Sequence, residues 1–482
     1  MCAKPTGFLD YPRRDVVKRP KSERVGDYRE VQAARPDNEL TEQAARCMDC
    51  GIPYCHAHGC PVANLIPDFN DMVYHGQWER ALILLHSTNN FPEVTGRICP
   101  APCETSCTLN LNQEPVTIRQ LELRIVERGW EEGWIRPEPP MVKSGHRVAI
   151  IGSGPAGLAA AQQLARAGHA VTVFERDEKI GGLLRYGIPD FKLEKSVLDR
   201  RLEQMSAEGV LFETGVNVGT DISIGYLRRS YGAILLSGGA RQPRDLDVPG
   251  RDLKGIHFAM DFLVQQNQRV NGEATDNDTP ILATDRDVVI IGGGDTGADC
   301  LGTCLRQKAR SVTQFEIMPQ PPPVRSASPA WPEWPYMLRT GTSHEEGGTR
   351  RWCVTTKEFL GTDGQVSSLR CTEVEWVQKD GERPRLKELP EKEFAQTASL
   401  VLLAMGFTRE GNSEVLSGFG IELTESGSPL LNASGMSTTP GVFVAGDLAA
   451  GASLVVRAIA DGRLAAEGIH AYLTESAPRQ QG

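Results

Sequence analysis

A strand-like run that leads into a glycine-rich loop is the feature that most constrains the fold of this sequence, and it occurs twice. The first run, residues 147–151, is apolar and β-branched, and Gly152-Ser-Gly-Pro-Ala-Gly157 follows it. A helix-like run and a second strand-like run come next, and the latter ends at Glu175. In a dinucleotide-binding unit, Gly152, Gly154 and Gly157 allow a tight turn and the close approach of pyrophosphate, and the acid binds a ribose hydroxyl. This order predicts a Rossmann-like unit.

The second unit begins at residues 287–291 and continues as Gly292-Gly-Gly-Asp-Thr-Gly297. We expect Gly292, Gly294, Asp295, Thr296 and Gly297 to bind a nicotinamide nucleotide at a helix N-terminus. Glu316 lies near the end of the next strand-like run, where an acid favours the free 2′-hydroxyl of NADH. Arg325, in the proline-rich stretch that follows, is a candidate for binding the 2′-phosphate of NADPH. The sequence therefore leaves both NADH and NADPH as candidates.

Two short motifs are candidates for closing a flavin site around the first loop. Gly181-Gly182-Leu183 follows the first unit closely, and the apolar run 441–445 ends at Gly446-Asp447. An aspartate in this position can hydrogen-bond the ribityl or phosphate part of a flavin. A plain turn is the alternative interpretation of the second motif.

Seven of the twelve cysteines lie between residues 47 and 107. Their spacing is C-x2-C-x4-C-x4-C-P, followed by C-P-A-P-C-x3-C. Thiolates are the ligands of iron–sulfur clusters, commonly four per cluster, and the interspersed prolines favour irregular backbone. Zinc is the alternative, although zinc sites usually show paired C-x2-C units and only one is present. The seven are Cys47, Cys50, Cys55, Cys60, Cys99, Cys103 and Cys107.

Two four-ligand clusters need one ligand that is not among these cysteines. Glu122 is a candidate because it lies on the apolar face that Ile118, Leu121 and Ile125 form at helical spacing. A carboxylate there needs a partner, which is either a metal or a nearby arginine. The rival candidates for the eighth ligand are His56, His58 and Cys2.

Composition argues against several classes of function. The formal net charge of −10 does not suit a nucleic-acid binder, and no apolar run is long enough to cross a membrane. The first residues lack the apolar core of a secretory signal, so we expect a cytoplasmic protein with reduced thiols. Basic residues between positions 4 and 24 predict either a solvated arm or an arm that wraps a partner. Cys300 and Cys304, one helical turn apart, are expected to be buried in packing rather than to form a redox pair.

The combined motifs resemble those of the small (β) subunits of bacterial glutamate synthases over essentially the whole chain. They include the two cysteine segments, both glycine-rich loops, Leu184-Arg-Tyr-Gly-Ile-Pro189 and Val444-Ala-Gly-Asp447. The N-terminal part is also similar to that of dihydropyrimidine dehydrogenase. The resemblance implies an α/β protein: a helical N-terminal iron–sulfur module followed by two Rossmann-like dinucleotide-binding domains of the glutathione-reductase type.

Domain limits and ligand sets follow from this resemblance as expectations. The iron–sulfur domain would span residues 1–140, the FAD domain 141–283 and 407–482, and the NAD(P)H domain 284–406. One [4Fe-4S] cluster would take Cys47, Cys50, Cys55 and Cys107, and the other would take Cys60, Cys99, Cys103 and Glu122. Besides the two loops, the implied nucleotide-binding residues are Glu175, Gly182, Leu183, Arg185, Gly446 and Asp447.

The resemblance also implies a reaction and a partner. NADPH, with NADH as the alternative, would reduce FAD, and two [4Fe-4S] clusters would pass the electrons to a large (α) subunit that makes glutamate from glutamine and 2-oxoglutarate. Gly297, where many NADPH enzymes carry alanine, and the stretch 317–323 resemble the fused NADH-dependent enzymes. Two rival hypotheses are a stand-alone NAD(P)H–ferredoxin-type oxidoreductase and a zinc-stabilised binding protein without activity.

Overall fold

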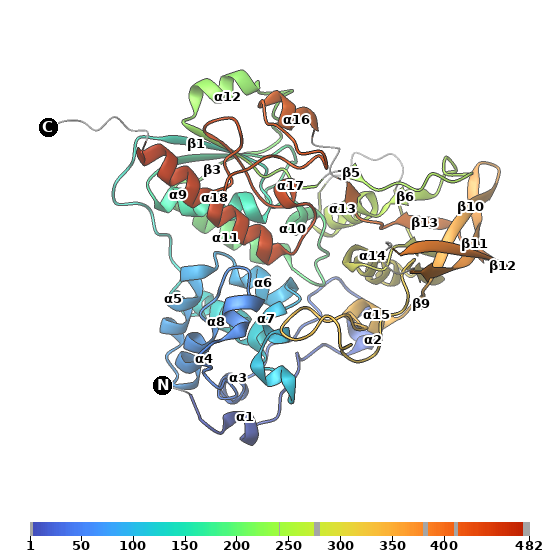
Figure 1. Cartoon of the computed structure of the whole chain (residues 1–482), viewed down its shortest axis with the longest axis horizontal. Coiled ribbons are helices and arrows are strands. Elements are labelled where there is room, and N and C mark those ends of the chain that lie inside the picture. Colours follow the sequence, from blue (N-terminus) through green and yellow to red (C-terminus); the bar gives the residue numbers. More distant parts are fainter. Residues whose placement is uncertain (1–2, 241, 274–279, 379–383, 409–412, 476–482) are drawn as a thin grey trace.

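A helical N-terminal module and two folds built on parallel sheets make up most of the chain (Figure 1). The computed structural model describes residues 3–240, 242–273, 280–378, 384–408 and 413–475. Each parallel sheet has five strands with helices beside it, which confirms the predicted α/β class. Among the described residues, no helix is both long and apolar enough to cross a membrane.

The N-terminal module is a cluster of short helices around a core of its own. Helix α8 begins at Ile118 rather than close to Pro115, because Thr117 before it is not helical. Ile118, Leu121 and Ile125 are buried on one face of α8, as their spacing predicts. The elements are α1 (Gly7–Asp10), α2 (Lys21–Arg24), α3 (Asp37–Ala44), the π-helix η1 (Cys55–Gly59), α4 (Ile66–Tyr74), α5 (Trp78–Thr88), α6 (Pro92–Ile98), α7 (Pro102–Thr105), the 3-10 helix η2 (Thr108–Leu111) and α8 (Ile118–Glu131).

The first sheet has the strand order β15-β4-β1-β2-β3, and all of its pairings are parallel. Four of the five residues in each of β1 and β2 are buried, as expected for β-branched strands in a parallel sheet. Its strands are β1 (Arg147–Ile151), β2 (Ala170–Phe174), β3 (Leu211–Glu213), β4 (Ala233–Leu236) and β15 (Val442–Val444). Its helices are α9 (Pro155–Arg166), α10 (Leu183–Tyr186), α11 (Lys195–Ala207), α12 (Ile224–Ser230), α16 (Ser413–Gly418), α17 (Asp447–Ala450) and α18 (Val455–Glu475).

The second sheet has the strand order β6-β13-β7-β8-β9 and is also parallel. Strand β6 precedes residue 284, the expected start of the second domain, so this fold uses earlier residues than the expectation assigned to it. Its strands are β6 (Ile256–Phe258), β7 (Asp287–Ile291), β8 (Ser311–Phe315), β9 (Thr349–Arg351) and β13 (Leu400–Leu403). Its helices are α13 (Ala259–Val270), α14 (Asp295–Arg306) and α15 (Thr342–Glu346).

Two smaller sheets complete the structure. A three-stranded antiparallel sheet of β10 (Val354–Thr362), β11 (Gln365–Val377) and β12 (Arg385–Thr397) lies at the outer end of the second fold (Figure 1). The pair β5 (Gln242–Pro243) and β14 (Phe407–Thr408) forms where the chain leaves the first fold and where it returns from the second.

Several basic residues of the N-terminal arm are paired within the chain, which argues against a simply solvated arm; the interpretation of an arm that wraps a partner stays a prediction. Arg13 Nη2 lies 2.8 Å from Glu104 Oε2. Lys18 Nζ lies 2.6 Å from Glu345 Oε1. Arg24 is buried and contacts the side chains of both Glu345 and Glu346 in α15. The arm therefore ties the N-terminal module to the second parallel fold.

Candidate functional site

The first glycine-rich loop has the geometry that a pyrophosphate site needs. Gly152 has a φ of +102°, and a Cβ there would lie 2.6 Å from the carbonyl oxygen of Ser237. A Cβ at Gly157 would overlap the carbonyl oxygen of Gly152, because α9 packs directly on the loop. By contrast, no atom lies within 4 Å of the Cβ position of Gly154. The loop is therefore closely packed at its two ends and open at its centre.

Glu175, at the end of β2, is bound to the same loop. Its Oε2 accepts hydrogen bonds from the backbone N–H and the hydroxyl of Ser153, at 3.0 and 2.6 Å. Its Oε1 accepts the N–H of Asp177 at 3.0 Å. The carboxylate is therefore held in place at the strand end, where the ribose-binding acid is predicted.

A cavity of about 910 Å³ lies between the two parallel folds. This volume suits a large organic cofactor. His257 and Asp261 belong to the opposite wall, which β6 and α13 supply. Most of the predicted flavin residues line the cavity, namely Gly152, Gly154, Glu175, Gly182, Leu183, Gly446 and Asp447.

Two predicted flavin residues do not line this cavity. Gly157 instead provides the close contact between α9 and the loop. Arg185 is buried, donates from Nε to the carbonyl oxygen of Ile180 at 3.0 Å, and pairs with Asp199. Its contacts are thus those of a residue that holds α10 in place.

The second loop repeats the geometry of the first. Gly292 has a φ of +125°, and a Cβ there would overlap the carbonyl oxygen of Ala404. Gly294 has open space at its Cβ position, as Gly154 does. Asp295 and Thr296 start α14 directly after the loop, and Gly297 is buried in its first turn. The open space at Gly294, called the cradle below, lies at the N-terminus of α14 and would be filled by a side chain. The loop therefore fits a phosphate group.

Glu316 takes the role of Glu175 in the second loop. Its Oε2 accepts the N–H of Gly293 at 2.9 Å, and its Oε1 accepts the N–H of Met318 at 2.9 Å. Arg325, the other sequence candidate near this loop, donates to the carbonyl oxygen of Glu333 at 2.6 Å.

Four cysteines line one small cavity inside the N-terminal module. They come from three separate segments: the turn after α3, the start of η1, and the residue before η2. Burial raises the pKa of the Cys47 thiol to about 12, so the thiol stays protonated near pH 7 when no metal is bound. A metal centre would displace these protons. The four are Cys47, Cys50, Cys55 and Cys107, the first predicted ligand set.

The second predicted set also comes together. Burial raises the pKa of both the Cys60 and the Cys99 thiol, and the carboxylate of Glu122 lies close enough to raise it further. The pKa of the Cys103 thiol is raised by burial and by Cys60, Cys99 and Glu122 together. Burial is the main cause that raises the pKa of Cys60 to about 11 and that of Cys99 to about 12. Closely grouped, buried thiols of this kind suit metal ligation.

Glu122 is buried, and among the residues that the structure describes it forms no ion pair with an arginine. Its Oε1 accepts hydrogen bonds from Asn89 Nδ2, at 3.0 Å, and from Thr95 Oγ1. Burial raises the pKa of Glu122 to about 7, so a cationic partner is needed to keep the carboxylate charged. Both described hydrogen bonds end on Oε1, which leaves Oε2 for such a partner. These contacts disfavour the arginine-paired interpretation.

Single-metal and cluster sites differ in how far apart their ligands stand. Within the described ranges, no three His, Cys, Asp or Glu side chains converge closely enough to hold a single metal ion. A zinc ion requires its ligands at 2.0–2.3 Å from one centre. The ligands of a four-iron cluster stand further apart because each binds a different iron.

The rival eighth ligands have other partners. His56 Nδ1 lies 3.0 Å from the carbonyl oxygen of Asn64, and His58 Nε2 lies 3.5 Å from Glu333 Oε1. Cys2 lies outside the described residues. Cys300 and Cys304 are fully buried in the core of the second fold, as predicted.

The second cysteine set adjoins the large cavity. Cys99 belongs to the apolar core of the first parallel fold, and Cys60 packs against that core. Ile98, the residue directly before Cys99, lines the large cavity itself. Cys47, Cys55, Cys103 and Cys107 belong to the core of the N-terminal module, and Cys60 packs against that core as well. The sequence alone did not show that the second cysteine set lies beside the large cavity.

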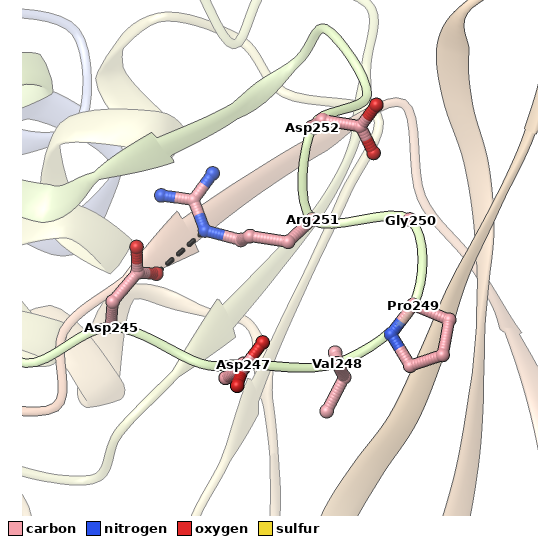
Figure 2. A pocket seen from close by; sticks show the side chains of 7 residues that line it. All are labelled: Asp245, Asp247, Val248, Pro249, Gly250, Arg251 and Asp252. Carbon is pink, nitrogen blue, oxygen red and sulfur yellow. Dashed lines mark hydrogen bonds and ion pairs between the residues drawn. The ribbon is translucent and has the colours of Figure 1, made fainter.

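A depression also lies on the loop of residues 245–252 that leads to β6 (Figure 2). Arg251 Nε lies 2.6 Å from Asp245 Oδ1 across it, and Asp247 and Asp252 lie at its rim. One loop supplies all of its lining residues, and none of them is a predicted site residue.

Comparison with known proteins identifies the class. Residues 24–134 match the family described as dihydropyrimidine dehydrogenase domain II, 4Fe-4S cluster, and residues 146–462 match the pyridine nucleotide-disulphide oxidoreductases. The solved structure of Mycobacterium tuberculosis FprA in complex with NADPH superposes with a TM-score of 0.53 at 19% identity, over 69% of this chain and 85% of that one. That likeness concerns the fold. Together, the fold, the site and the two families define an NAD(P)H-dependent oxidoreductase with a 4Fe-4S domain.

The similarity to curated proteins goes further. The glutamate synthase [NADPH] small chain of Mycobacterium tuberculosis H37Rv is 52% identical over 98% of this chain and 97% of its own length. The small chain of Bacillus subtilis is 42% identical over 98% and 99%. The chain belongs to the glutamate synthase small-chain family. The glutamate synthase [NADH] of Schizosaccharomyces pombe is 43% identical over 96% of this chain, which corresponds to 22% of that longer protein.

These matches support the predicted family and the predicted cofactors, which are FAD, NADPH and [4Fe-4S] clusters.

Proposed function

We propose that this chain is the electron-input subunit of a glutamate synthase, in the cytoplasm, with a large (α) subunit as its partner in a hetero-oligomer. FAD and two [4Fe-4S] clusters, when bound, would supply hydride transfer from NAD(P)H and single-electron transfer to the large subunit, which would make glutamate from glutamine and 2-oxoglutarate. One observation carries the proposal: Ile98 lines the large cavity and Cys99, the next residue, belongs to the second cysteine set.

The first parallel fold is proposed to bind FAD. Gly154 leaves room for the pyrophosphate at the N-terminus of α9, and Glu175 is held at the ribose position. Gly182, Leu183 and the pair Gly446-Asp447 line the same cavity. Gly157 supports the site through packing, and Arg185 supports it by holding α10.

The second parallel fold is proposed to bind NAD(P)H through its own loop. Gly292 and Gly297 shape the loop, Gly294 leaves space for phosphate, and Asp295 and Thr296 start α14. The relatives named for NADPH and for NADH are both similar to this chain. We propose NADPH as the main donor, with NADH as the alternative. The proposed NAD(P)H domain, 284–406, gains β6 and α13 from before residue 284.

The N-terminal module, residues 1–140, is proposed to hold both clusters. Cys60, Cys99, Cys103 and Glu122 would bind the cluster next to the flavin, and Cys47, Cys50, Cys55 and Cys107 would bind the one further away. The packing of Cys60 and Cys99 on the apolar core of the first fold supports this order. The outer cluster would then pass electrons to the large subunit.

The test is co-purification of the native complex under anaerobic conditions, with iron, sulfide and flavin analysis. The proposal expects one FAD and about eight iron atoms per chain, four per cluster. The isolated chain should oxidise NADPH with an artificial acceptor but should make no glutamate from glutamine and 2-oxoglutarate. Glutamate formation by this chain alone would overturn the subunit assignment, and reduction of ferredoxin without any copurifying large subunit would favour a stand-alone enzyme.

A further inference from the structure

The first glycine of the second loop is held by a side chain from the neighbouring strand. Gln314, in β8, donates from Nε2 to the carbonyl oxygen of Gly292 at 2.8 Å. The Gln314 side chain is buried, and this hydrogen bond is partly buried. Its Oε1 accepts a hydrogen bond from His344 Nε2, also at 2.8 Å. One amide therefore connects the loop to helix α15.

The protonation state of His344 suits this connection. Burial is the main cause that lowers the pKa of His344 to about 4, and Arg350 and Lys192 lower it further against the opposing charge of Asp295. The imidazole is therefore neutral near pH 7. Its Nδ1 accepts the backbone N–H of Gly341 at 3.4 Å, so the proton lies on Nε2, where Gln314 needs a donor.

Helix α15 is itself anchored by buried charges. Glu346 pairs with Arg306 of α14, with Nη1 and Oε2 2.6 Å apart, and both side chains have no exposed surface. Arg24 of the N-terminal arm adds a second contact, with Nε 2.8 Å from Glu346 Oε1. His344 therefore lies on an anchored helix, and its hydrogen bond restricts the position of the Gln314 side chain.

The first loop uses a related device. Ser237, directly after β4, donates its hydroxyl to the carbonyl oxygen of Gly152 at 2.9 Å. The equivalent carbonyl in both loops is therefore held by a side chain from an adjacent strand. Only in the second loop does this side chain continue to a histidine.

The same glutamine explains the glycine at position 297. A Cβ at Gly297 would overlap both Nε2 of Gln314 and the carbonyl oxygen of Gly292 that it holds. Glycine is thus required by the Gln314 side chain and the carbonyl position that it sets. This packing accounts for Gly297 without reference to the nucleotide that is bound.

We propose that Gln314 and His344 are positioning residues of the nicotinamide nucleotide site: together they hold the Gly292 carbonyl and so orient the loop's open cradle at Gly294 toward the pyrophosphate. This inference rests on the proposed function of the second loop. Neither side chain needs to touch the nucleotide, since both act through the loop backbone.

The first test replaces Gln314 with methionine, which keeps the length and removes both hydrogen bonds. NADPH and NADH binding to the FAD-loaded chain would be measured by titration. We expect Kd to rise about 3- to 10-fold for both nucleotides, the effect of losing one to two hydrogen bonds. KM should rise similarly while kcat at saturation and the flavin spectrum stay unchanged. An unchanged Kd would overturn the proposal.

Gln307→Met is the matched control. Gln307 is a buried glutamine at the other end of α14, where it donates to Gln266 Oε1 at 2.6 Å and accepts the N–H of Ala283 at 2.7 Å. Its loss should lower Tm about as much as the Gln314 substitution does and leave Kd unchanged. An equal rise of Kd in both variants would mean that general destabilisation is the cause, and the proposal would fall.

The histidine is tested by a pair of substitutions. His344→Gln keeps an N–H donor for Gln314, and His344→Leu removes it. We expect His344→Leu to raise Kd about as much as Gln314→Met does and His344→Gln to restore most of the affinity. Equal effects of the two substitutions would exclude the hydrogen bond as the cause.

A double-mutant cycle tests the constraint on Gly297. Gly297→Ala alone should raise Kd about tenfold or more, because the added methyl displaces the held carbonyl. In Gln314→Ser/Gly297→Ala, the carbonyl is released, and Kd should fall below that of Gly297→Ala alone. Strictly additive effects would overturn the constraint.

One further variant separates this inference from the proposed function. Gly294→Val fills the cradle itself. If it leaves NADPH and NADH binding intact, the second loop is not the nucleotide site and the proposed function fails there. If it abolishes binding while Gln314→Met matches its control, only the positioning role is wrong.

Discussion

The guanidinium carbon of Arg306 lies 3.8 Å from the centre of the Phe191 ring, which brings a residue of the second parallel fold onto the first. A Cβ at Gly302, one turn earlier in α14, would lie 2.9 Å from Phe191 Cζ, so the ring fills the notch that this glycine leaves. Arg306 also pairs with Glu346, and Lys192 of the first fold pairs with Asp299 of α14. The two folds are therefore joined by buried charges as well as by packing.

We predict that Glu346→Gln destabilises the chain strongly. The change leaves the Arg306 and Arg24 guanidinium groups without their shared buried carboxylate, at a cost of about 3–5 kcal/mol. Thermal and urea unfolding would measure it. Glu388→Gln, which breaks an exposed pair with Lys357, is the control and should cost about 0–1 kcal/mol. Similar losses in both variants would contradict the account of this junction.

Gly154→Val should abolish FAD retention. The valine side chain would occupy the space left open at the N-terminus of α9, where the pyrophosphate is proposed to lie. The flavin content of purified protein, read from its absorbance, checks this. Gly225→Val, at an exposed glycine with only Arg229 nearby, should keep full flavin content. Full FAD occupancy in Gly154→Val would refute the assignment of this loop as the pyrophosphate site.

Glu122→Gln should remove one cluster. Glutamine keeps the size of the side chain but lacks the anionic oxygen that is proposed as the fourth ligand of the second set. We expect iron to fall from about eight to about four atoms per chain. Glu131→Gln, on the exposed side of α8, serves as the control and should leave iron unchanged. A full iron complement in Glu122→Gln would exclude this carboxylate as a ligand.

The stability of the folded chain should decrease as pH falls, and part of this decrease should depend on His344. Its folded pKa, about 4, lies below the ordinary value of 6.5, so the unfolded chain binds more protons between these two values. The contribution is fully present above pH 6.5 and is lost as pH falls towards 4. His169, whose pKa burial also lowers to about 4, contributes in the same window. Unfolding of His344→Gln from pH 7 to pH 4 should show a shallower decline than the parent chain, and identical slopes would be evidence against it.

Local patterns in the sequence predicted the local elements well. Strands β1 and β7 match the predicted runs residue for residue, because short β-branched runs before glycine loops have one favourable environment in a parallel sheet. Strands β2 and β8 end one and two residues before the predicted limits, where Glu175 and the pair Glu316-Ile317 leave the sheet. The grouping of the cysteines into two sets came from family resemblance rather than from spacing.

Other features depend on contacts between distant segments and left no signal in the sequence. Arg185 is held by an ion pair with Asp199. Arg24 of the N-terminal arm pairs with Glu345 of α15. The Gln314–His344 contact crosses from β8 to α15. The antiparallel sheet of β10 to β12 was not predicted: β12 is mostly exposed, and the buried residues of β10 and β11 pack into a core that distant strands complete. Such features are set by three-dimensional packing, which local periodicity does not encode.

The N-terminal arm also has a consequence for the order of assembly. Arg24 hydrogen-bonds to Thr342 and Glu345, 318 and 321 residues further along the chain. During synthesis these partners emerge long after the cysteine module, so the arm can close only when the second parallel fold has been made. The seven cysteines therefore spend most of translation without this brace, and the interval is open to whatever machinery delivers iron and sulfide to the nascent protein.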